Sequence, residues 1–258
     1  MYIASSQNPR IKHVVRLRDD RRERRRTGLT VAEGHDEIRM ATTAGHVPVT
    51  IFTSPEAAAL DEMPAAGEVV TVSQAAFRKM SYRENPDGWL AVFRIRYMEL
   101  DKFQVGDGCL VMIVESVEKP GNLGAILRTA DAAGVDLVIS CGTSGDLWSP
   151  NVIRASRGTA FTTRGVEADS VDIMRWLKAQ GIRSLAATPS ATTVYTSADM
   201  RGRIAIVVGS EDRGLSSFWL SGADAQISIP LHGSVNSLNV SVAAAILLYE
   251  AVRQRSQP

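Results

Sequence analysis

The chain has 258 residues, enough for one large domain or two modest ones. Its 29 Lys and Arg residues nearly balance its 28 Asp and Glu residues, and 45% of its residues are hydrophobic, as in an ordinary soluble globular protein. No apolar run approaches the roughly 20 residues that a membrane span needs, and the first residues hold no apolar signal-peptide core. We therefore expect a cytoplasmic protein without a membrane-spanning segment.

Two cysteines, Cys109 and Cys141, are the only ones in the chain. Each falls in or beside an apolar strand pattern, which favours buried reduced thiols over a disulfide. No cluster of His and Cys residues has the spacing of a zinc site, so we expect no metal.

The first predicted element is one helix over residues 8–26. Pro9 suits a first helical turn, and Ile11, Val14 and Leu17 supply apolar positions. The helix is crowded with basic residues, which fits a contact with a phosphate backbone and equally fits a solvated face with ion pairs. The residues that we single out as candidate RNA contacts are Arg10, Lys12, Arg21, Arg22 and Arg25.

The rest of the first hundred residues alternates short strands with short helices, which predicts a small α/β domain. The predicted strands are 29–32, 49–53, 68–72 and 89–95. The predicted helices are 34–44, 55–60 and one that begins after Ser73.

A linker over 97–107 precedes a second alternating stretch, which is typical of a parallel sheet covered by helices. Its predicted strands are 110–114, 135–139, 185–188, 204–208 and the short run 227–229. Its predicted helices are 122–133, 149–157, 170–180 and a long last one from Val240. No GxGxxG follows the first of these strands, which argues against an ordinary dinucleotide site.

Three segments of this second half stand out: ESVEKPGNLGAILR at 115–128, IAIVVGSEDRGLS at 204–216, and IPLHGSVNSLNVSVAAAILLYEAVRQR at 229–255. In this order, they resemble the three signature motifs of the SPOUT superfamily. Within it they resemble the TrmH/SpoU branch, the S-adenosylmethionine-dependent RNA ribose 2′-O-methyltransferases. The resemblance covers about residues 109–255.

The phrases NPRIK, VAEGHDEI and NPDGWLAVFR, less specific than the three motifs, look like the L30e-like substrate-binding domain of many such enzymes. His35 and Trp89 depart from that pattern. The resemblance implies an L30e-like RNA-binding domain over 1–97, a linker over 98–107 and a SPOUT methyltransferase domain over 108–258. It also implies a trefoil knot and a homodimer, with the motif-one helix and the last helix at the interface and a site completed across subunits.

The family's catalytic residues map onto Arg128, Asn122, Glu211, Ser237 and Asn239. Arg128 is often proposed as the general base, although a guanidinium is nearly always protonated. Anchoring a phosphate or stabilising the developing alkoxide is easier to defend. An arginine making a surface ion pair is the structural alternative. We expect Asn122 to cap its helix and hold Arg128 or the nucleotide, and Glu211 to orient Asn122, Arg128 or loop N–H groups. Ser237 and Asn239 are expected to position the ribose and Arg128.

The resemblance also implies an S-adenosylmethionine site with loop backbone and apolar walls. The residues expected there are Thr188, Gly209, Ser210, Ile229, Leu231 and Leu238. Arg154 and Arg157 could contact RNA phosphates, and a role as helix-end charges accounts for them equally well.

The predicted function is therefore S-adenosylmethionine-dependent 2′-O-methylation of a ribose in structured RNA, with 23S rRNA favoured because of the extra N-terminal domain. The nearest alternative is a tRNA substrate. Two other classes are a non-catalytic RNA-binding or ribosome-assembly factor and a nucleotide-binding regulatory protein. The motif residues are all present, which speaks against the former, and the arginine-rich start speaks against the latter.

Overall fold

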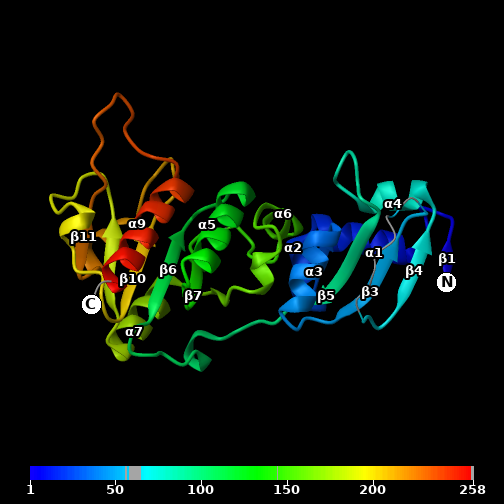
Figure 1. The fold of residues 1–258 in the computed structure, drawn as a ribbon, viewed down its shortest axis with the longest axis horizontal. Helices are drawn as coiled ribbons and strands as arrows, with labels where there is room; N and C mark the ends of the chain where they lie inside the picture. The colour runs from blue at the N-terminus through cyan, green and yellow to red at the C-terminus, as the bar shows by residue number, and fades with distance from the viewer. Residues whose placement is uncertain (56, 58–64, 144, 257–258) are drawn as a thin grey trace. The chain divides into compact units, whose positions relative to one another are not determined.

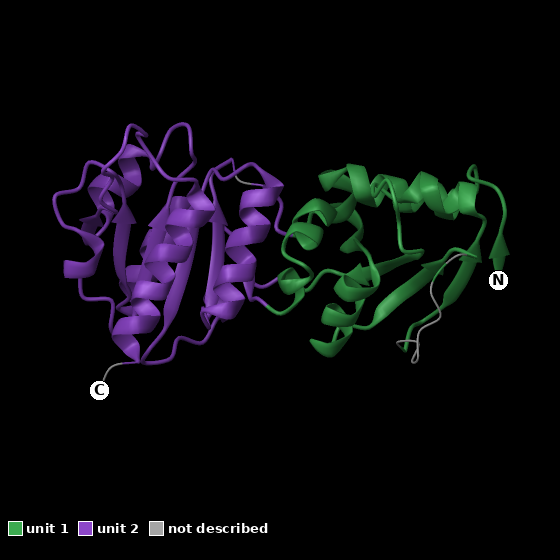
Figure 2. Ribbon diagram, turned by 45° about the horizontal axis from the view of Figure 1, so that its top comes forward, with its two compact units in different colours: residues 1–96, 148–162 green, residues 97–147, 163–258 purple. Residues whose placement is uncertain are grey.

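A computed structural model describes residues 1–55, 57, 65–143 and 145–256. The chain forms two compact units, each with its own sheet (Figure 2). Unit 1 comprises Met1–Arg96 and Trp148–Thr162, and unit 2 comprises Tyr97–Leu147 and Thr163–Pro258. Within the described residues, no helix is long and apolar enough to cross a membrane.

Unit 1 is built on a five-stranded sheet with the order β1-β4-β3-β5-β2. β5 runs antiparallel to both of its neighbours, whereas β1, β4 and β3 are mutually parallel. The strands are β1 (Tyr2–Ile3), β2 (Leu29–Glu33), β3 (Pro48–Thr53), β4 (Val69–Val72) and β5 (Trp89–Arg94). The prediction missed β1 because two residues are too few to show a period. Most of the helix predicted over 55–60, residues 56 and 58–60, lies outside the described residues.

Four helices of unit 1 are α1 (Pro9–Asp19), α2 (Arg21–Thr27), α3 (His35–Thr43) and α4 (Gln74–Met80). α1 and α4 bury their apolar faces with the sheet, around Ile11, Leu17 and Phe77. The prediction of a single helix over 8–26 is wrong at Asp20. Its backbone is extended and its side chain accepts from the Arg22 N–H, so it ends α1 and caps α2. Aspartate is among the best N-cap residues, which explains the break.

The segment Trp148–Thr162 packs within unit 1, although the predicted domain boundaries assigned it to the methyltransferase domain. It contains α6 (Pro150–Ala155) and the 3-10 turn η2 (Thr159–Phe161). The Thr30 hydroxyl donates to the Trp148 carbonyl at 2.7 Å, and the Phe161 ring lies 4.9 Å from that of Phe93. Contacts between residues so distant in the chain leave no trace in the alternation of strands and helices.

Unit 2 contains a six-stranded, wholly parallel sheet with the order β11-β9-β10-β6-β7-β8. The strands are β6 (Leu110–Glu115), β7 (Leu137–Cys141), β8 (Gly165–Glu167), β9 (Arg183–Ala187), β10 (Ile204–Val208) and β11 (Ala225–Ile227). The predicted α/β class with a parallel sheet is confirmed. The strand predicted over 135–139 begins two residues later, and β8 was not predicted. The knot stays a prediction, because strand order does not describe threading.

Helices cover both faces of this sheet (Figure 1). α7 (Ser170–Gln180) and α8 (Ser217–Gly222) share a buried cluster with alternate residues of β6 and β10, such as Ile113 and Val207. α5 (Pro120–Ala132) packs against α9 (Val240–Arg255), and α9 packs against β10. The turns η1 (Leu100–Lys102) and η3 (Tyr195–Ser197) lie in connecting segments.

Both cysteines are buried free thiols, as predicted, and burial raises the pKa of each to about 11. They are inert parts of the unit 2 core. Because the strands are parallel, the loops that follow β6, β9, β10 and β11 leave from one edge of the sheet. The three conspicuous sequence segments therefore meet at that edge.

Candidate active site

A cavity of about 280 Å³, here called the cofactor cavity, opens among the loops at this edge. The structure places all six residues predicted to bind the cofactor around it. They are Thr188, Gly209, Ser210, Ile229, Leu231 and Leu238. Ser237 also lines it, between Asn236 and Leu238.

The loop after β10 forms one wall of the cofactor cavity, and its shape depends on Gly209. A Cβ atom at Gly209 would lie 2.2 Å from the carbonyl carbon and oxygen of Gly214, so no other residue fits without a shift of the backbone. The loop closes on itself because the Gly214 N–H donates to the Ser210 carbonyl at 2.9 Å. The backbone can therefore approach a ligand closely.

The remaining walls suit a nucleoside ligand. Ile229, Leu231 and Leu238 supply apolar, half-buried side chains that a flat ring can pack against. Thr188 brings a hydroxyl, 3.0 Å from the Ser190 hydroxyl, to the end of β9. Apolar walls with a few fixed polar groups are what an adenosine-containing cofactor requires.

Beside the cofactor cavity lies a cluster of four polar side chains, the Glu211 cluster, formed by Glu211, Lys119, Asn122 and Asn239. Glu211 accepts from Lys119 Nζ at 2.8 Å, from Asn122 Nδ2 at 2.9 Å and from Asn239 Nδ2. Asn239 Nδ2 also lies 3.1 Å from Asn122 Oδ1. The cluster thus joins residues from all three motifs.

The charge of Glu211 is fixed by this arrangement. Hydrogen bonds from Lys119 and then Asn122 lower the pKa of Glu211 despite its partial burial, and the same contact raises the pKa of Lys119. Glu211 is therefore a stable carboxylate at neutral pH. A carboxylate that already accepts several hydrogen bonds is a positioning group rather than a strong base.

The expectation that Asn122 caps its helix is wrong. Pro120 begins α5, Lys119 occupies the cap position, and Asn122 lies in the first turn with its amide turned toward Glu211. Asn239 does cap its helix: its Oδ1 accepts from the Ser241 N–H at 3.0 Å. Of the partners expected for Glu211, which were Asn122, Arg128 or loop N–H groups, the structure shows Asn122 in contact with it.

Arg128 lies on the exposed side of α5, six residues beyond Asn122, which is about 9 Å along a helix. Among the described residues it makes no hydrogen bond or ion pair, so neither Glu211 nor Asn122 holds it within one chain. Ser237 is also exposed, and its side chain bonds no described residue. The structure therefore gathers Asn122, Glu211 and Asn239 and leaves Arg128 outside this cluster.

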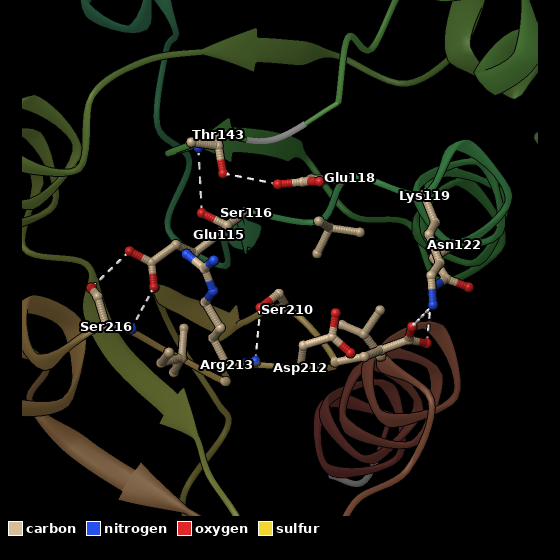
Figure 3. Close-up of a pocket in the computed structure, with 15 residues that line it drawn as sticks. Glu115, Ser116, Glu118, Lys119, Asn122, Thr143, Ser210, Asp212, Arg213 and Ser216 are labelled. Atoms are coloured by element: carbon tan, nitrogen blue, oxygen red, sulfur yellow. Dashed lines mark hydrogen bonds and ion pairs between the residues drawn. The ribbon is translucent and has the colours of Figure 1, made fainter.

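A second cavity of about 360 Å³, here called the polar cavity, is drawn in Figure 3. It adjoins the first, because the two share lining residues. Its lining includes residues that sequence reasoning missed: Glu115, Ser116, Glu118 and Thr143. Glu115 ends β6, Ser116 and Glu118 lie just after it, and Thr143 lies just after β7, so polar residues at the end of a buried strand were the available signal. Ser116 has φ 55°, a left-handed conformation that is uncommon outside glycine and often marks a functional turn.

Comparisons with known proteins identify the family of the chain. A model described as the SpoU rRNA Methylase family matches residues 109–249, more than half of the chain. The chain belongs to this family. An MRM3-like substrate binding domain matches residues 8–91. The resemblance to the TrmH/SpoU branch is confirmed.

Relatives in this family match nearly the whole chain. The 23S rRNA (guanosine(2553)-2′-O)-methyltransferase RlmP of Bacillus subtilis is 27% identical, over 96% of this chain and 97% of its own. The 23S rRNA (uridine(2479)-2′-O)-methyltransferase of Streptomyces viridochromogenes is 29% identical, over 97% and 92%. An AdoMet-bound rRNA methyltransferase from Sinorhizobium meliloti has a TM-score of 0.89 at 28% identity, covering 98% of this chain and 97% of its own. S-adenosylmethionine is the cofactor of such enzymes, and the cofactor cavity fits it.

The basic residues predicted to bind RNA lie in unit 1, the unit that contains the substrate-binding match. One group lies on α1 and α2, and the other consists of Arg154 and Arg157. Arg10 is engaged, because its guanidinium bonds both carboxylate oxygens of Glu68, at 3.0 and 2.5 Å. Arg21 is half-buried. Lys12, Arg22 and Arg25 are exposed.

Arg154 and Arg157 are exposed beside a hollow of unit 1 that also contains carboxylates. Arg157 lies 3.7 Å from Asp36, and the Arg154 guanidinium lies 5.5 Å from the centre of the Tyr82 ring. Their charges are therefore partly balanced within the protein. Among the described residues, no group of His, Cys, Asp and Glu could hold a metal ion.

Proposed function

We propose that this protein transfers a methyl group from S-adenosylmethionine to the 2′-oxygen of a ribose in 23S rRNA. The observation that carries the proposal is the wall between the two cavities. Ser210, Glu211, Gly214 and Val240 line both the cofactor cavity and the polar cavity, so a nucleotide in one would meet a cofactor in the other. Relatives that match the whole length of the chain, RlmP among them, are named as 23S rRNA 2′-O-methyltransferases.

The bound cofactor supplies a methyl group that its sulfonium has already activated, so the main task of the protein is alignment. The Glu211 cluster contributes to this alignment from one side of the target ribose. Glu211 fixes the amides of Asn122 and Asn239, which come from helices far apart in the chain. The hydroxyl must also lose its proton, which passes to solvent water. Arg128 would stabilise the developing negative oxygen, since a guanidinium donates and does not accept.

The position of Arg128 supports a homodimer. Along α9, Val242 and Tyr249 are 46% and 51% exposed and, with half-buried Ile246 between them, form an apolar stripe. α5, which carries Arg128, packs beside α9. Pairing these helices with those of a second copy would cover the stripe and bring Arg128 to the partner's site.

The test is mass-spectrometric mapping of nucleosides after incubation with labelled S-adenosylmethionine and either undermethylated rRNA or tRNA. We expect one 2′-O-methyl site in 23S rRNA, absent with Arg128→Ala. A site in tRNA would overturn the substrate assignment and keep the reaction. Cofactor binding without methylation of any RNA would favour a non-catalytic RNA-binding factor.

The dimer has its own test. Arg128→Ala should be inactive and Glu211→Ala strongly impaired, and a refolded mixture of the two should be more active than either variant alone if each site takes Arg128 from the other copy. A mixture no more active than the average of its two parts would mean that each site takes Arg128 and Glu211 from the same copy.

A further inference from the structure

The polar cavity adjoins the place where the proposed reaction occurs. The Glu211 cluster would hold the target ribose at the wall shared by the two cavities, because Glu211 and Asn122 line the polar cavity. The base attached to that ribose must occupy adjoining space. Sequence-specific RNA recognition takes unstacked bases and bonds their edges, and a polar cavity of about 360 Å³ is the adjoining space.

Two carboxylates of the polar cavity are already used within the protein. Glu115 accepts from the backbone N–H and the hydroxyl of Ser216, each at 2.7 Å. Glu211 belongs to its cluster. Glu118, in contrast, is exposed and accepts only from the Thr143 hydroxyl, at 3.3 Å, among the described residues. A carboxylate can accept about four hydrogen bonds, so Glu118, which lines the cavity, keeps most of its capacity for a ligand.

A chain of contacts orients Glu118. Figure 3 shows it beside Thr143, whose N–H donates to the Ser116 hydroxyl at 3.3 Å. Ser116 can lie this close because Gly142 has no side chain: a Cβ there would be 2.5 Å from the Ser116 hydroxyl oxygen. Asp212 is the other exposed carboxylate of the cavity, and no such bond braces its side chain within the described part of the chain. Preorganised groups bind more tightly, which favours Glu118 as the contact.

The four bases differ in what they offer to a carboxylate. Guanine carries two adjacent donors, N1–H and the N2 amino group, which match both carboxylate oxygens. Adenine and cytosine place an acceptor nitrogen beside their amino group, and uracil flanks its single N–H with two carbonyls. Arg213 lines the same cavity and offers donors that suit O6 or N7 of guanine.

We infer that the polar cavity receives the base of the target nucleotide, that this base is guanine, and that Glu118 determines this specificity by accepting from N1–H and N2–H. The inference rests on the proposed function and adds the identity of the base to it.

The nucleoside map tests the base first. 2′-O-methylguanosine is expected, and any other methylated nucleoside overturns this inference while leaving the proposed function intact. Absence of RNA methylation despite cofactor binding is the distinct failure of the proposed function, and this inference fails with it.

Variants then test the residue on RNA with the mapped site. Glu118→Gln should lower kcat/KM about tenfold or more, as expected for a lost bidentate base contact, with unchanged cofactor affinity and melting temperature. Glu99→Gln, the same change at an exposed linker residue, should leave kcat/KM unchanged. Inosine at the target position lacks the N2 amino group, so it should cost the wild type more than it costs Glu118→Gln. Equal inosine penalties in both, an unaffected Glu118→Gln variant, or a loss confined to Asp212→Asn would overturn the assignment of Glu118.

Discussion

Glu211 joins parts of the site that lie far apart in the chain. Its carboxylate accepts from Lys119 and Asn122 at the start of α5 and from Asn239 at the start of α9. The ion pair with Lys119 is exposed, since 70% of the Lys119 side chain is open to solvent. Exposed ion pairs contribute little, whereas amides left without an acceptor lose their orientation.

We therefore predict different effects of two changes at this position. Glu211→Ala should lower kcat/KM by about 10- to 100-fold, the value of hydrogen bonds to a charged acceptor. Glu211→Gln keeps one acceptor oxygen for the asparagine amides, so its loss should be about fivefold or less. Steady-state methyl transfer measures both, with cofactor affinity as the control. Equal losses in the two variants would show that the charge of Glu211, rather than its acceptor geometry, is what matters.

At the scale of elements, the arginines at the start of the chain have two different roles: some stabilise the fold, and others are exposed and available to RNA. The break at Asp20 turns α2 so that Arg24 is buried, and its Nη1 donates to the carbonyls of Leu17 at 2.6 Å and Arg18 at 3.1 Å. These carbonyls end α1 and would otherwise lack a partner. Arg22, two residues away, is exposed to solvent.

Two matched substitutions should separate these purposes. Arg24→Met should lower the free energy of unfolding by about 1–3 kcal/mol, because it leaves buried carbonyls unpaired. Arg22→Met should change it by less than about 0.5 kcal/mol and instead weaken RNA binding, reducing the salt slope of the affinity by about one. Urea unfolding and salt-dependent RNA titration measure these effects. If Arg22→Met binds RNA as tightly as the wild type at every salt concentration, this face of α2 does not contact RNA.

Sequence patterns predicted most of these elements but not their partners. β10 and α7 match their predicted bounds. A wholly buried strand appears in the sequence as a continuous apolar run, and an amphipathic helix appears as apolar residues at helical spacing. The six cofactor-site residues were found through a resemblance, and geometry then placed them around one cavity. The break at Asp20 had a local signal, an aspartate able to cap a new helix, which the prediction did not use. The side chain of Asn122 and the polar cavity depend on contacts between distant residues, which no local pattern records.

At the scale of the whole molecule, a buried histidine makes the stability of unit 1 depend on pH. His46 bonds the Phe161 carbonyl at 3.2 Å and lies among the rings of Trp148 and Phe161. Burial, and secondly the charge of Arg96, lower the pKa of His46. His46 therefore binds a proton more readily in the unfolded chain than in the folded chain.

The stabilisation from neutral His46 should be complete above the unfolded pKa of about 6.5 and should be lost as the pH falls below it. We predict that His46→Gln, which stays neutral, loses less stability than the wild type between about pH 7.5 and pH 5.5. Thermal unfolding of both proteins at the two pH values provides the comparison. Parallel losses would mean that folding does not lower the pKa of His46.

The return of Trp148–Thr162 to unit 1 has a consequence for modularity. The chain passes between the units three times, after Arg96, Leu147 and Thr162. In a chimera in which only residues 1–96 came from a relative, Trp148 and Phe161 would still come from this protein. The ring contacts that Phe161 makes with His46 and Phe93 would then have to form between residues of two different proteins. Chimeras between relatives should therefore fold when residues 1–96 and 148–162 are exchanged together. Unit 1 behaves as one module made of two separate segments of the chain.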